Sequence, residues 1–218
     1  MKIAVLGAAG RLGSSIVKAA LDEGSVEIES LSSRDIPAKT ESKIWIFAGL
    51  PSSLSVCLHK AVFQNIRLVV GTTGLEESDR QEMVEASHSI PLFYSPNFSL
   101  GIALMKKFAE LTASGFHRNA HIDLIETHHA RKKDAPSGTA LWIAKAIEER
   151  HPQPCRLHSI RSGSIPGEHT LYFNTPEEKL TLIHETHNPI AFGRGALAAA
   201  RFLLHQGAGL YGMDHLLA

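Results

Sequence analysis

In the first hundred residues, short apolar runs alternate with segments in which apolar residues recur at helical spacing. The apolar runs predict strands at 3–6, 26–31, 44–47, 66–70 and 91–94. The periodic segments predict helices at 14–22, 54–63 and 76–87. Strands that alternate with helices in this way are typical of a parallel α/β sheet with helices on both faces. We therefore expect a doubly wound parallel sheet in this part of the chain.

The pattern changes after residue 100. A long helical segment at 101–113 and a strand at 122–127 lead into a polar loop at 128–138 and a helix at 139–150. Alternating segments then predict extended structure at 157–161, 169–173 and 179–184, before a last helix at 196–205. This half predicts a second α+β domain with a mixed sheet. We expect the first domain to comprise 1–98 and 188–218, and the second to comprise 99–187.

Composition narrows the class of protein. The 218 residues carry 22 basic and 22 acidic side chains, so the net charge gives no sign of a nucleic-acid partner. No apolar run approaches the roughly 20 residues of a membrane span, so we expect no membrane partner. Two cysteines, Cys57 and Cys155, are too few for a disulfide framework. These features favour a reduced, cytoplasmic protein.

A glycine-rich turn directly follows the first predicted strand: Gly7, Ala8, Ala9, Gly10, Arg11, Leu12 and Gly13. Glycine lets the backbone approach a phosphate closely, and the helix that follows presents free N–H groups. This context predicts a dinucleotide cofactor in a Rossmann-like first domain. A ligand-free glycine turn is the alternative. Arg11 could reach the pyrophosphate or be solvated.

The end of the second strand bears on the choice of cofactor. A basic residue there tolerates a 2′-phosphate, whereas an acidic residue binds the ribose hydroxyl. The chain has Ser32, Ser33 and Arg34, followed by Asp35. Arg34 favours NADPH, and Asp35 leaves NADH open.

The segment from Glu126 to Ala140 has the densest chemistry. It contains two histidines, of which either is a natural proton donor near neutral pH. Lys132 or Lys133 adds a positive charge, and Ser137 begins a predicted helix whose free N–H groups suit a carboxylate.

This segment resembles the pattern E-x-H-H-x-x-K-x-D-A-P-S-G-T-A of the dihydrodipicolinate reductases, and it keeps every fixed position. Segments at 7–13, 71–74, 96–101, 161–169, 195–197 and 211–213 also resemble that family, in the same order. By position, the resemblance implies that His128 is the acid–base residue and Lys132 its catalytic partner. His129, Gly138 and Thr139 would hold a substrate carboxylate. It assigns further residues to the cofactor: Gly71, Thr72, Thr73, Ser95, Pro96, Asn97 and Phe98.

The same resemblance implies an activity and an assembly. The expected reaction is hydride transfer from NADPH or NADH to a cyclic dicarboxylate, 4-hydroxy-tetrahydrodipicolinate, in diaminopimelate and lysine biosynthesis. Water is lost and tetrahydrodipicolinate is formed. The family also implies a homotetramer built through the second domain.

Two departures from the family pattern keep a second hypothesis open. The connection after the second strand is short, and 47–51 lacks the usual aspartate and hydroxyl residue. Pro189 stands where the family often has an arginine, a role that Arg194 could take. A dinucleotide-binding sensor without catalysis is therefore the alternative. The 13 histidines raise a third hypothesis, a metallohydrolase, but His184 and His187 lack ligand spacing with other residues, so we expect no metal site.

Overall fold

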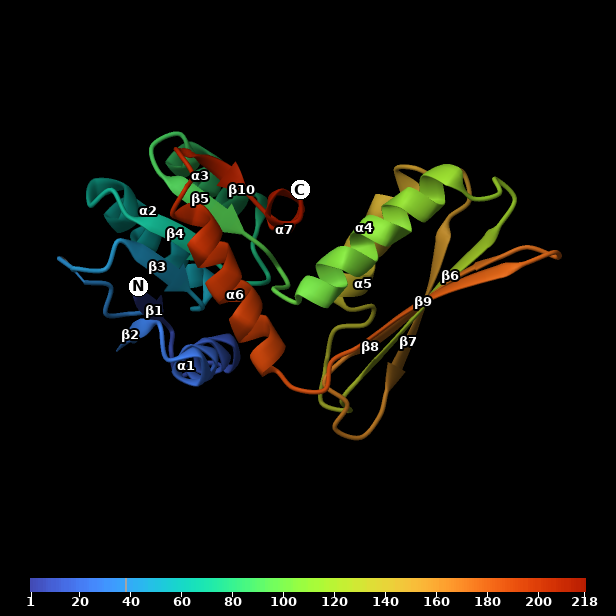
Figure 1. The fold of residues 1–218 in the computed structure, drawn as a ribbon, viewed down its shortest axis with the longest axis horizontal. Coiled ribbons are helices and arrows are strands. Elements are labelled where there is room, and N and C mark those ends of the chain that lie inside the picture. Colours follow the sequence, from blue (N-terminus) through green and yellow to red (C-terminus); the bar gives the residue numbers. More distant parts are fainter. Residues whose placement is uncertain (38) are drawn as a thin grey trace. The chain divides into compact units, whose positions relative to one another are not determined.

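The computed structural model describes residues 1–37 and 39–218 and divides the chain into two compact units (Figure 1). The first unit comprises Met1–Leu100 and Pro189–Ala218, and the second comprises Gly101–Asn188. The C-terminal segment therefore returns to the unit in which the chain begins.

A six-stranded sheet forms the centre of the first unit. Its strands, in spatial order, are β10 (Gly209–Tyr211), β5 (Pro91–Tyr94), β4 (Arg67–Val70), β3 (Ile44–Phe47), β1 (Lys2–Leu6) and β2 (Glu27–Leu31). Every neighbouring pair is parallel. All four residues of β3 are buried, as expected for a strand that is covered on both faces. The predicted doubly wound parallel sheet is confirmed.

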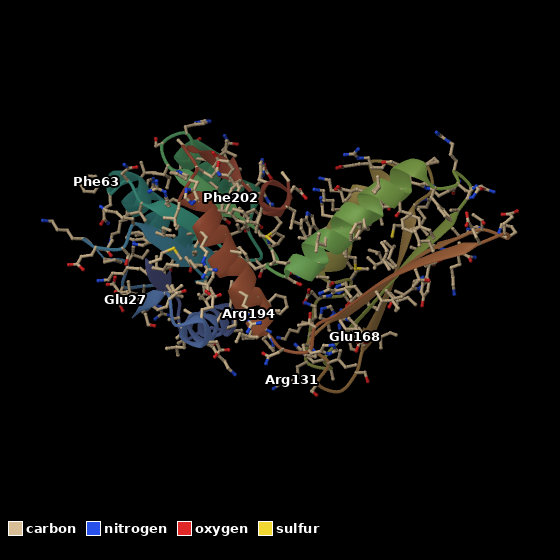
Figure 2. The ribbon with its side chains drawn as sticks, in the orientation of Figure 1. Glu27, Phe63, Arg131, Glu168, Arg194 and Phe202 are labelled. Atoms are coloured by element: carbon tan, nitrogen blue, oxygen red, sulfur yellow. The ribbon has the colours of Figure 1, made fainter. Side chains whose placement is uncertain are left out.

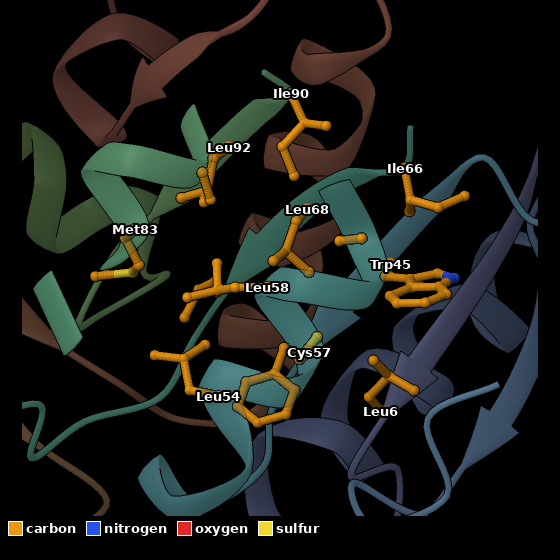
Figure 3. Close-up of a cluster of buried hydrophobic side chains, with 14 of the residues drawn as sticks. Leu6, Trp45, Leu54, Cys57, Leu58, Ile66, Leu68, Met83, Ile90 and Leu92 are labelled. Carbon is orange, nitrogen blue, oxygen red and sulfur yellow. The ribbon is translucent and has the colours of Figure 1, made fainter. Parts of the chain in front are cut away.

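Helices cover both faces of this sheet (Figure 1). Their bounds are α1 (Arg11–Glu23), α2 (Leu54–Phe63), α3 (Glu77–Ser87), α6 (Ile190–Leu203) and the short α7 (Met213–Leu216), with a 3₁₀ turn at Pro51–Ser53. The side chains of Trp45, Leu68 and Leu92 on one sheet face pack with Leu58 of α2 and Met83 of α3 in one buried cluster (Figure 3). The opposite face carries α1 and α6.

Helix α6 begins at Ile190, whereas the sequence predicted a helix from 196 to 205. Glycine has a low helix propensity, but the two glycines of this segment permit close packing within a continuous helix. A Cβ on Gly193 would lie 2.1 Å from the Ser15 carbonyl oxygen, and a Cβ on Gly195 would lie 1.7 Å from the Phe98 carbonyl oxygen.

The second unit is a four-stranded sheet with helices on one face (Figure 1). Its elements are α4 (Leu100–Gly115), β6 (His121–His128), α5 (Gly138–Glu148), β7 (Cys155–Arg161), β8 (Glu168–Asn174) and β9 (Lys179–Glu185). The strand order is β7-β6-β8-β9. Strand β6 runs parallel to β7 and antiparallel to β8, and β8 runs antiparallel to β9. The predicted α+β domain with a mixed sheet is confirmed.

Alternation along the strands gives this sheet one buried face. Ile122, Leu124, Leu171 and Phe173 pack in a cluster with residues of α4 and α5. The opposite face contains partly exposed side chains from the same strands, so it is the open face of the unit.

Two further observations concern the whole described chain. Cys57 and Cys155 are free and buried, and burial raises the pKa of both thiols. Within residues 1–37 and 39–218, none of the helices combines the length and apolar character needed to cross a bilayer.

Candidate active site

The end of β6 places a carboxylate beside the predicted acid–base histidine. Glu126 and His128 are two residues apart on a strand, so both side chains point to the same face of the sheet. That face is the buried one, and Glu126 is 0% exposed. Nδ1 of His128 is hydrogen-bonded to Oε2 of Glu126.

Arg161 neutralises the buried Glu126. It ends β7, opposite His128 in the parallel register of β6 and β7. Its Nη1 donates to Oε2 of Glu126 at 2.9 Å, and its Nη2 donates to Oε1 at 2.7 Å. The Ser137 backbone N–H donates to Oε1 at 3.2 Å. A two-pronged guanidinium–carboxylate pair of this kind is strong and directional.

The ionisation states of Glu126 and His128 follow from these contacts. Burial disfavours the charged form of Glu126, but hydrogen bonds from Arg161, Ser159 and His128 outweigh it and hold its pKa below the usual value. Burial lowers the pKa of His128, and the positive charges of Lys132 and Arg161 add to this against the opposing effect of Glu126. Near neutral pH the site therefore holds a carboxylate and a neutral imidazole.

The other side of the His128 ring faces Gly167 and His169. A Cβ on Gly167 would lie 3.2 Å from Nε2 of His128, so glycine leaves space against that nitrogen. The rings of His128 and His169 meet edge to face with centroids 5.4 Å apart. Burial, with the charges of His128 and His184, lowers the pKa of His169 to about 3.

The polar loop after β6 is attached to the same network. Nη2 of Arg161 donates to the Asp134 carbonyl oxygen at 2.6 Å. Nζ of Lys132 lies 2.8 Å from Oδ2 of Asp134. Ser137 caps α5, because its Oγ accepts a hydrogen bond from Ala140 N at 3.1 Å. Arg131, in this loop, and Glu168, which opens β8, are labelled in Figure 2.

The predicted substrate residues belong to this one segment. His129 follows His128, and its backbone oxygen accepts from the Lys132 N–H at 3.0 Å. Gly138 and Thr139 form the first turn of α5. All five residues that were predicted to act in catalysis or to bind substrate therefore lie on β6, the loop after it or the start of α5. Their roles remain predictions.

In the first unit, the glycine turn lines a pocket of about 800 Å³. Gly7 has a φ of +91°, and a Cβ there would lie 2.7 Å from the Ala48 carbonyl oxygen, so the turn requires glycine. Of the predicted cofactor residues, Gly7, Ala8, Ala9 and Gly10 line the pocket. Gly10 caps α1 without a side-chain hydrogen bond.

The other predicted cofactor residues do not line this pocket. Arg11 and Arg34 are exposed. Gly71 lies against Leu12 and Phe98, which a Cβ would meet at 2.4 and 2.9 Å. The rest follow the carboxyl ends of β4 and β5: Thr72, Thr73, Ser95, Pro96 and Asn97.

Hydrogen bonds stabilise the turns that follow β4 and β5. The Thr72 hydroxyl donates to the Gly49 carbonyl oxygen at 2.9 Å. Asn97 N donates to Ser95 Oγ at 3.2 Å, and Ser99 N donates to Asn97 Oδ1 at 2.8 Å.

Sequence reasoning did not assign Glu126, Gly167 or Lys18 to a site, and it included Arg161 as the first residue of the family-like segment 161–169. Spacing of two along a strand pointed to a shared face for Glu126 and His128. The register of β6 and β7, which brings Arg161 to them, was not available from the sequence. Lys18 lines the pocket at the glycine turn because it lies on α1 beside Ser14.

The metal hypothesis gains no support. Within the part of the chain that the structure describes, no group of three or more His, Cys, Asp and Glu side chains is arranged to hold a metal ion. Arg194, proposed as a substitute for the family arginine, is exposed on α6 in the first unit (Figure 2).

Comparison with known proteins identifies the family. The family model "Dihydrodipicolinate reductase, N-terminus" matches residues 1–98, and the model for the C-terminus matches residues 101–217. A 4-hydroxy-tetrahydrodipicolinate reductase from Caldanaerobacter subterraneus subsp. tengcongensis is 34% identical, covering 100% of this chain and 98% of that protein. One from Xanthomonas campestris pv. campestris is 35% identical with the same coverage.

A solved structure shares the fold. Dipicolinate-bound dihydrodipicolinate reductase from Paenisporosarcina sp. TG-14 matches with a TM-score of 0.84 at 21% identity, covering 99% of this chain and 98% of that one. The two family models together span nearly the whole sequence, and the relatives match it end to end. The chain belongs to the dihydrodipicolinate reductase family.

Proposed function

We propose that the chain reduces 4-hydroxy-tetrahydrodipicolinate with NADPH or NADH, as its curated relatives are named for doing. One hydride and one proton enter, and water and tetrahydrodipicolinate leave. The observation that carries the proposal is the intact 126–140 segment, in which the buried Glu126 contacts His128 and the start of α5 while Lys132 pairs with Asp134. The pathway is the synthesis of diaminopimelate and lysine.

The chain's own chemistry is proton supply and anion binding. His128 is neutral in the free protein, with Nε2 next to the space left by Gly167. A bound dicarboxylate would raise the pKa of His128, since negative charge nearby favours the imidazolium. His128 would then donate its Nε2 proton as hydride reaches the conjugated imine. Lys132, which pairs with Asp134, supplies a positive charge in the loop after His128.

The substrate carboxylates require N–H donors and positive charge. Gly138 and Thr139 form the first turn of α5, where the positive end of the helix dipole favours an anion. His129 precedes Lys132 in the same loop. We propose that these residues bind a substrate carboxylate.

The first unit fits a dinucleotide. The turn at 7–10 lines a pocket beside the uncapped start of α1, which is the geometry that receives a pyrophosphate. When bound, the reduced nicotinamide supplies the hydride. We propose that the turns at 71–73 and 95–98 also contact this cofactor, together with Arg11 and Leu12. Support comes from their place after the carboxyl ends of parallel strands, where such ligands bind.

For the choice of cofactor, we propose NADPH over NADH. Lys18, Ser32 and Ser33 line the pocket near the end of β2, and Arg34 follows directly. A positive charge there favours a 2′-phosphate. The Lys18→Ala and Arg34→Ala variants, assayed with each cofactor, would separate the two cations. A higher KM for NADPH but an unchanged KM for NADH identifies the residue that binds the phosphate.

The experiment follows loss of nicotinamide absorbance while the preceding synthase makes the substrate from pyruvate and aspartate semialdehyde. NADPH and NADH are run side by side, and omission of the synthase is the control. Turnover that depends on the synthase supports the proposal. Cofactor binding without turnover would instead favour the catalytically degenerate sensor, for which Pro189 and the 47–51 segment remain the sequence arguments.

We also propose a homotetramer assembled through the open sheet face of the second unit. Ile160 is 48% exposed and Ile183 is 65% exposed on strands of that sheet, an arrangement that favours a protein contact. We propose a cytoplasmic location because the proposed reaction consumes a reduced nicotinamide cofactor, which that compartment supplies.

A further inference from the structure

The buried Glu126–Arg161 pair has a consequence for the proton chemistry of His128. Glu126 is 0% exposed and lies on the same face of β6 as His128. A carboxylate in such a place is tolerated only when it is fully paired. Here Oε1 accepts hydrogen bonds from Arg161 and Ser137 N, and Oε2 accepts one from Arg161 and also contacts Nδ1 of His128.

An ionised carboxylate can only accept hydrogen bonds. The two-pronged contact from the Arg161 guanidinium, at 2.9 Å to Oε2 and 2.7 Å to Oε1, holds Glu126 in the ionised form and its pKa below the usual value. The imidazole nitrogen that contacts Glu126 must therefore be the donor, so Nδ1 of His128 carries the hydrogen. In a neutral ring the second nitrogen, Nε2, is then the unprotonated one.

We infer that Glu126, held by Arg161, is the positioning residue that fixes His128 in its Nδ1–H tautomer and presents Nε2 as the nitrogen that gains and donates the proton. Glu126 does not touch the substrate and acts through His128. Gly167 completes the arrangement, because any larger side chain there would lie against Nε2.

The same pair couples the histidine to the binding loop. Arg161 also donates to the Asp134 carbonyl oxygen at 2.6 Å, and Asp134 holds Lys132 at 2.8 Å. Glu126 also accepts from Ser137 N, directly before Gly138. Glu126 therefore contacts the proton donor and the start of α5 directly, and Arg161 links it to Asp134, which pairs with the lysine.

The first test is made on the unaltered protein. With ¹⁵N-labelled histidine, the inference predicts that the His128 ring near neutral pH shows the shift pattern of a protonated Nδ1 and an unprotonated Nε2. The opposite tautomer overturns it. This readout does not depend on the substrate, so it stands apart from the proposed function on which the catalytic part of the inference rests.

The second test is Glu126→Gln, which keeps the shape but offers an amide N–H₂ that donates. We expect His128 to switch tautomer and kcat to fall by about 10²–10⁴-fold, the range for loss of acid–base catalysis, with the KM for the nicotinamide cofactor within about threefold. Glu178→Gln is the matched control, since Glu178 Oε1 pairs with the exposed His117 at 3.0 Å. It should leave kcat unchanged.

Two outcomes would contradict the inference. A Glu126→Gln protein with parental kcat shows that the tautomer does not matter, and one with low kcat but the parental tautomer shows that Glu126 acts only on structure. If Glu126→Gln does not fold, the tautomer measured in the unaltered protein decides alone.

Discussion

His169 is a buried histidine whose two ring nitrogens have no hydrogen-bond partner among the described residues. Its side chain lies between His128 and His184, with ring centroids 5.4 and 6.5 Å away. Burial, followed by the neighbouring charges of His128 and His184, lowers its pKa from 6.5 to about 3. Between these two pH values, His169 is neutral in the folded protein and protonated in the unfolded chain.

This exclusion predicts acid sensitivity. Between the unfolded pKa of 6.5 and the folded pKa of about 3, the unfolded state binds more protons, so stability falls as pH falls. For this one group, the free energy of unfolding should drop by about 1.6 kcal/mol between pH 6.5 and pH 5. Urea unfolding of the parent and of His169→Phe measures it. The variant should lose less stability over that interval, and exposed His88→Phe should behave like the parent. Equal losses in parent and His169→Phe would refute the assignment.

Lys132 and Lys133 are adjacent lysines with different surroundings. Lys132 pairs with Asp134 at 2.8 Å and is partly buried, whereas Lys133 is exposed. We expect Lys132→Ala to lower kcat/KM for the substrate by about tenfold or more, because a charge–carboxylate contact is worth roughly 1.5–3 kcal/mol. Lys133→Ala is the control and should stay within about twofold. Steady-state kinetics would contradict the role of Lys132 if the two variants matched.

At the residue level, the sequence named His128 and Lys132 as candidate catalytic residues but did not show which residues contact them. His128 and Lys132 stand in a fixed pattern that sequence reasoning can read. Arg161 lies far along the chain and reaches Glu126 only through the parallel register that pairs His128 with Arg161. No local rule gives that register, because it depends on which strands become neighbours.

At the level of elements, the contact between α1 and α6 is set by glycine. Gly193 of α6 packs against the backbone of Ser15, and Gly195 packs against the backbone of Phe98. The first approach lets two helices on the same sheet face lie closer than side chains would permit, and the second brings α6 close to the turn after β5. Glycine costs helix stability, so its presence here has a packing reason.

Substitution at this contact should be costly. We expect Gly193→Ala to lower the free energy of unfolding by about 1–3 kcal/mol, because the new Cβ would lie 2.1 Å from the Ser15 oxygen and the helices must separate. Gly207→Ala in the same unit is the control, since a Cβ there meets nothing within 4 Å. Thermal unfolding of the two variants would disprove the packing argument if Gly193→Ala were as stable as Gly207→Ala.

The same glycines explain where element prediction went wrong. Apolar periodicity gave the parallel strands and the helices between them, because a strand buried on both faces is a continuous apolar run. The start of α6 was placed six residues too late, at 196 instead of Ile190; glycine has a low helix propensity, and the packing that favours glycine here is a tertiary contact. Strand β10 has three residues and was not predicted, since its pairing with β5 is its only distinguishing feature.

At the level of the whole molecule, the open sheet face distinguishes the second unit. Its helices cover one face, and the other carries Ile125, Ile160, Tyr172 and Ile183 at least partly exposed. Apolar side chains that gather on an uncovered sheet usually mark an interface. The proposed homotetramer would cover them.

Charge on this face should break the assembly. We expect Ile183→Asp to reduce the molar mass in solution, because a buried unpaired carboxylate at an interface is strongly unfavourable. Leu111→Asp on α4 is the matched control, since Leu111 is also exposed, at 71%, but lies on a helix rather than on the open sheet face. Light scattering after size exclusion gives both masses. An unchanged mass for Ile183→Asp would remove this face from the assembly.

The most direct test of the central claim compares the parent with His128→Gln in the synthase-coupled assay, while NADPH binding is followed by fluorescence. Loss of the proton donor predicts a fall in kcat of about 10²–10⁴-fold with NADPH affinity unchanged, because the dinucleotide pocket belongs to the other unit. Parental turnover in His128→Gln would show that the site lies elsewhere. No turnover in the parent itself would contradict the reductase function.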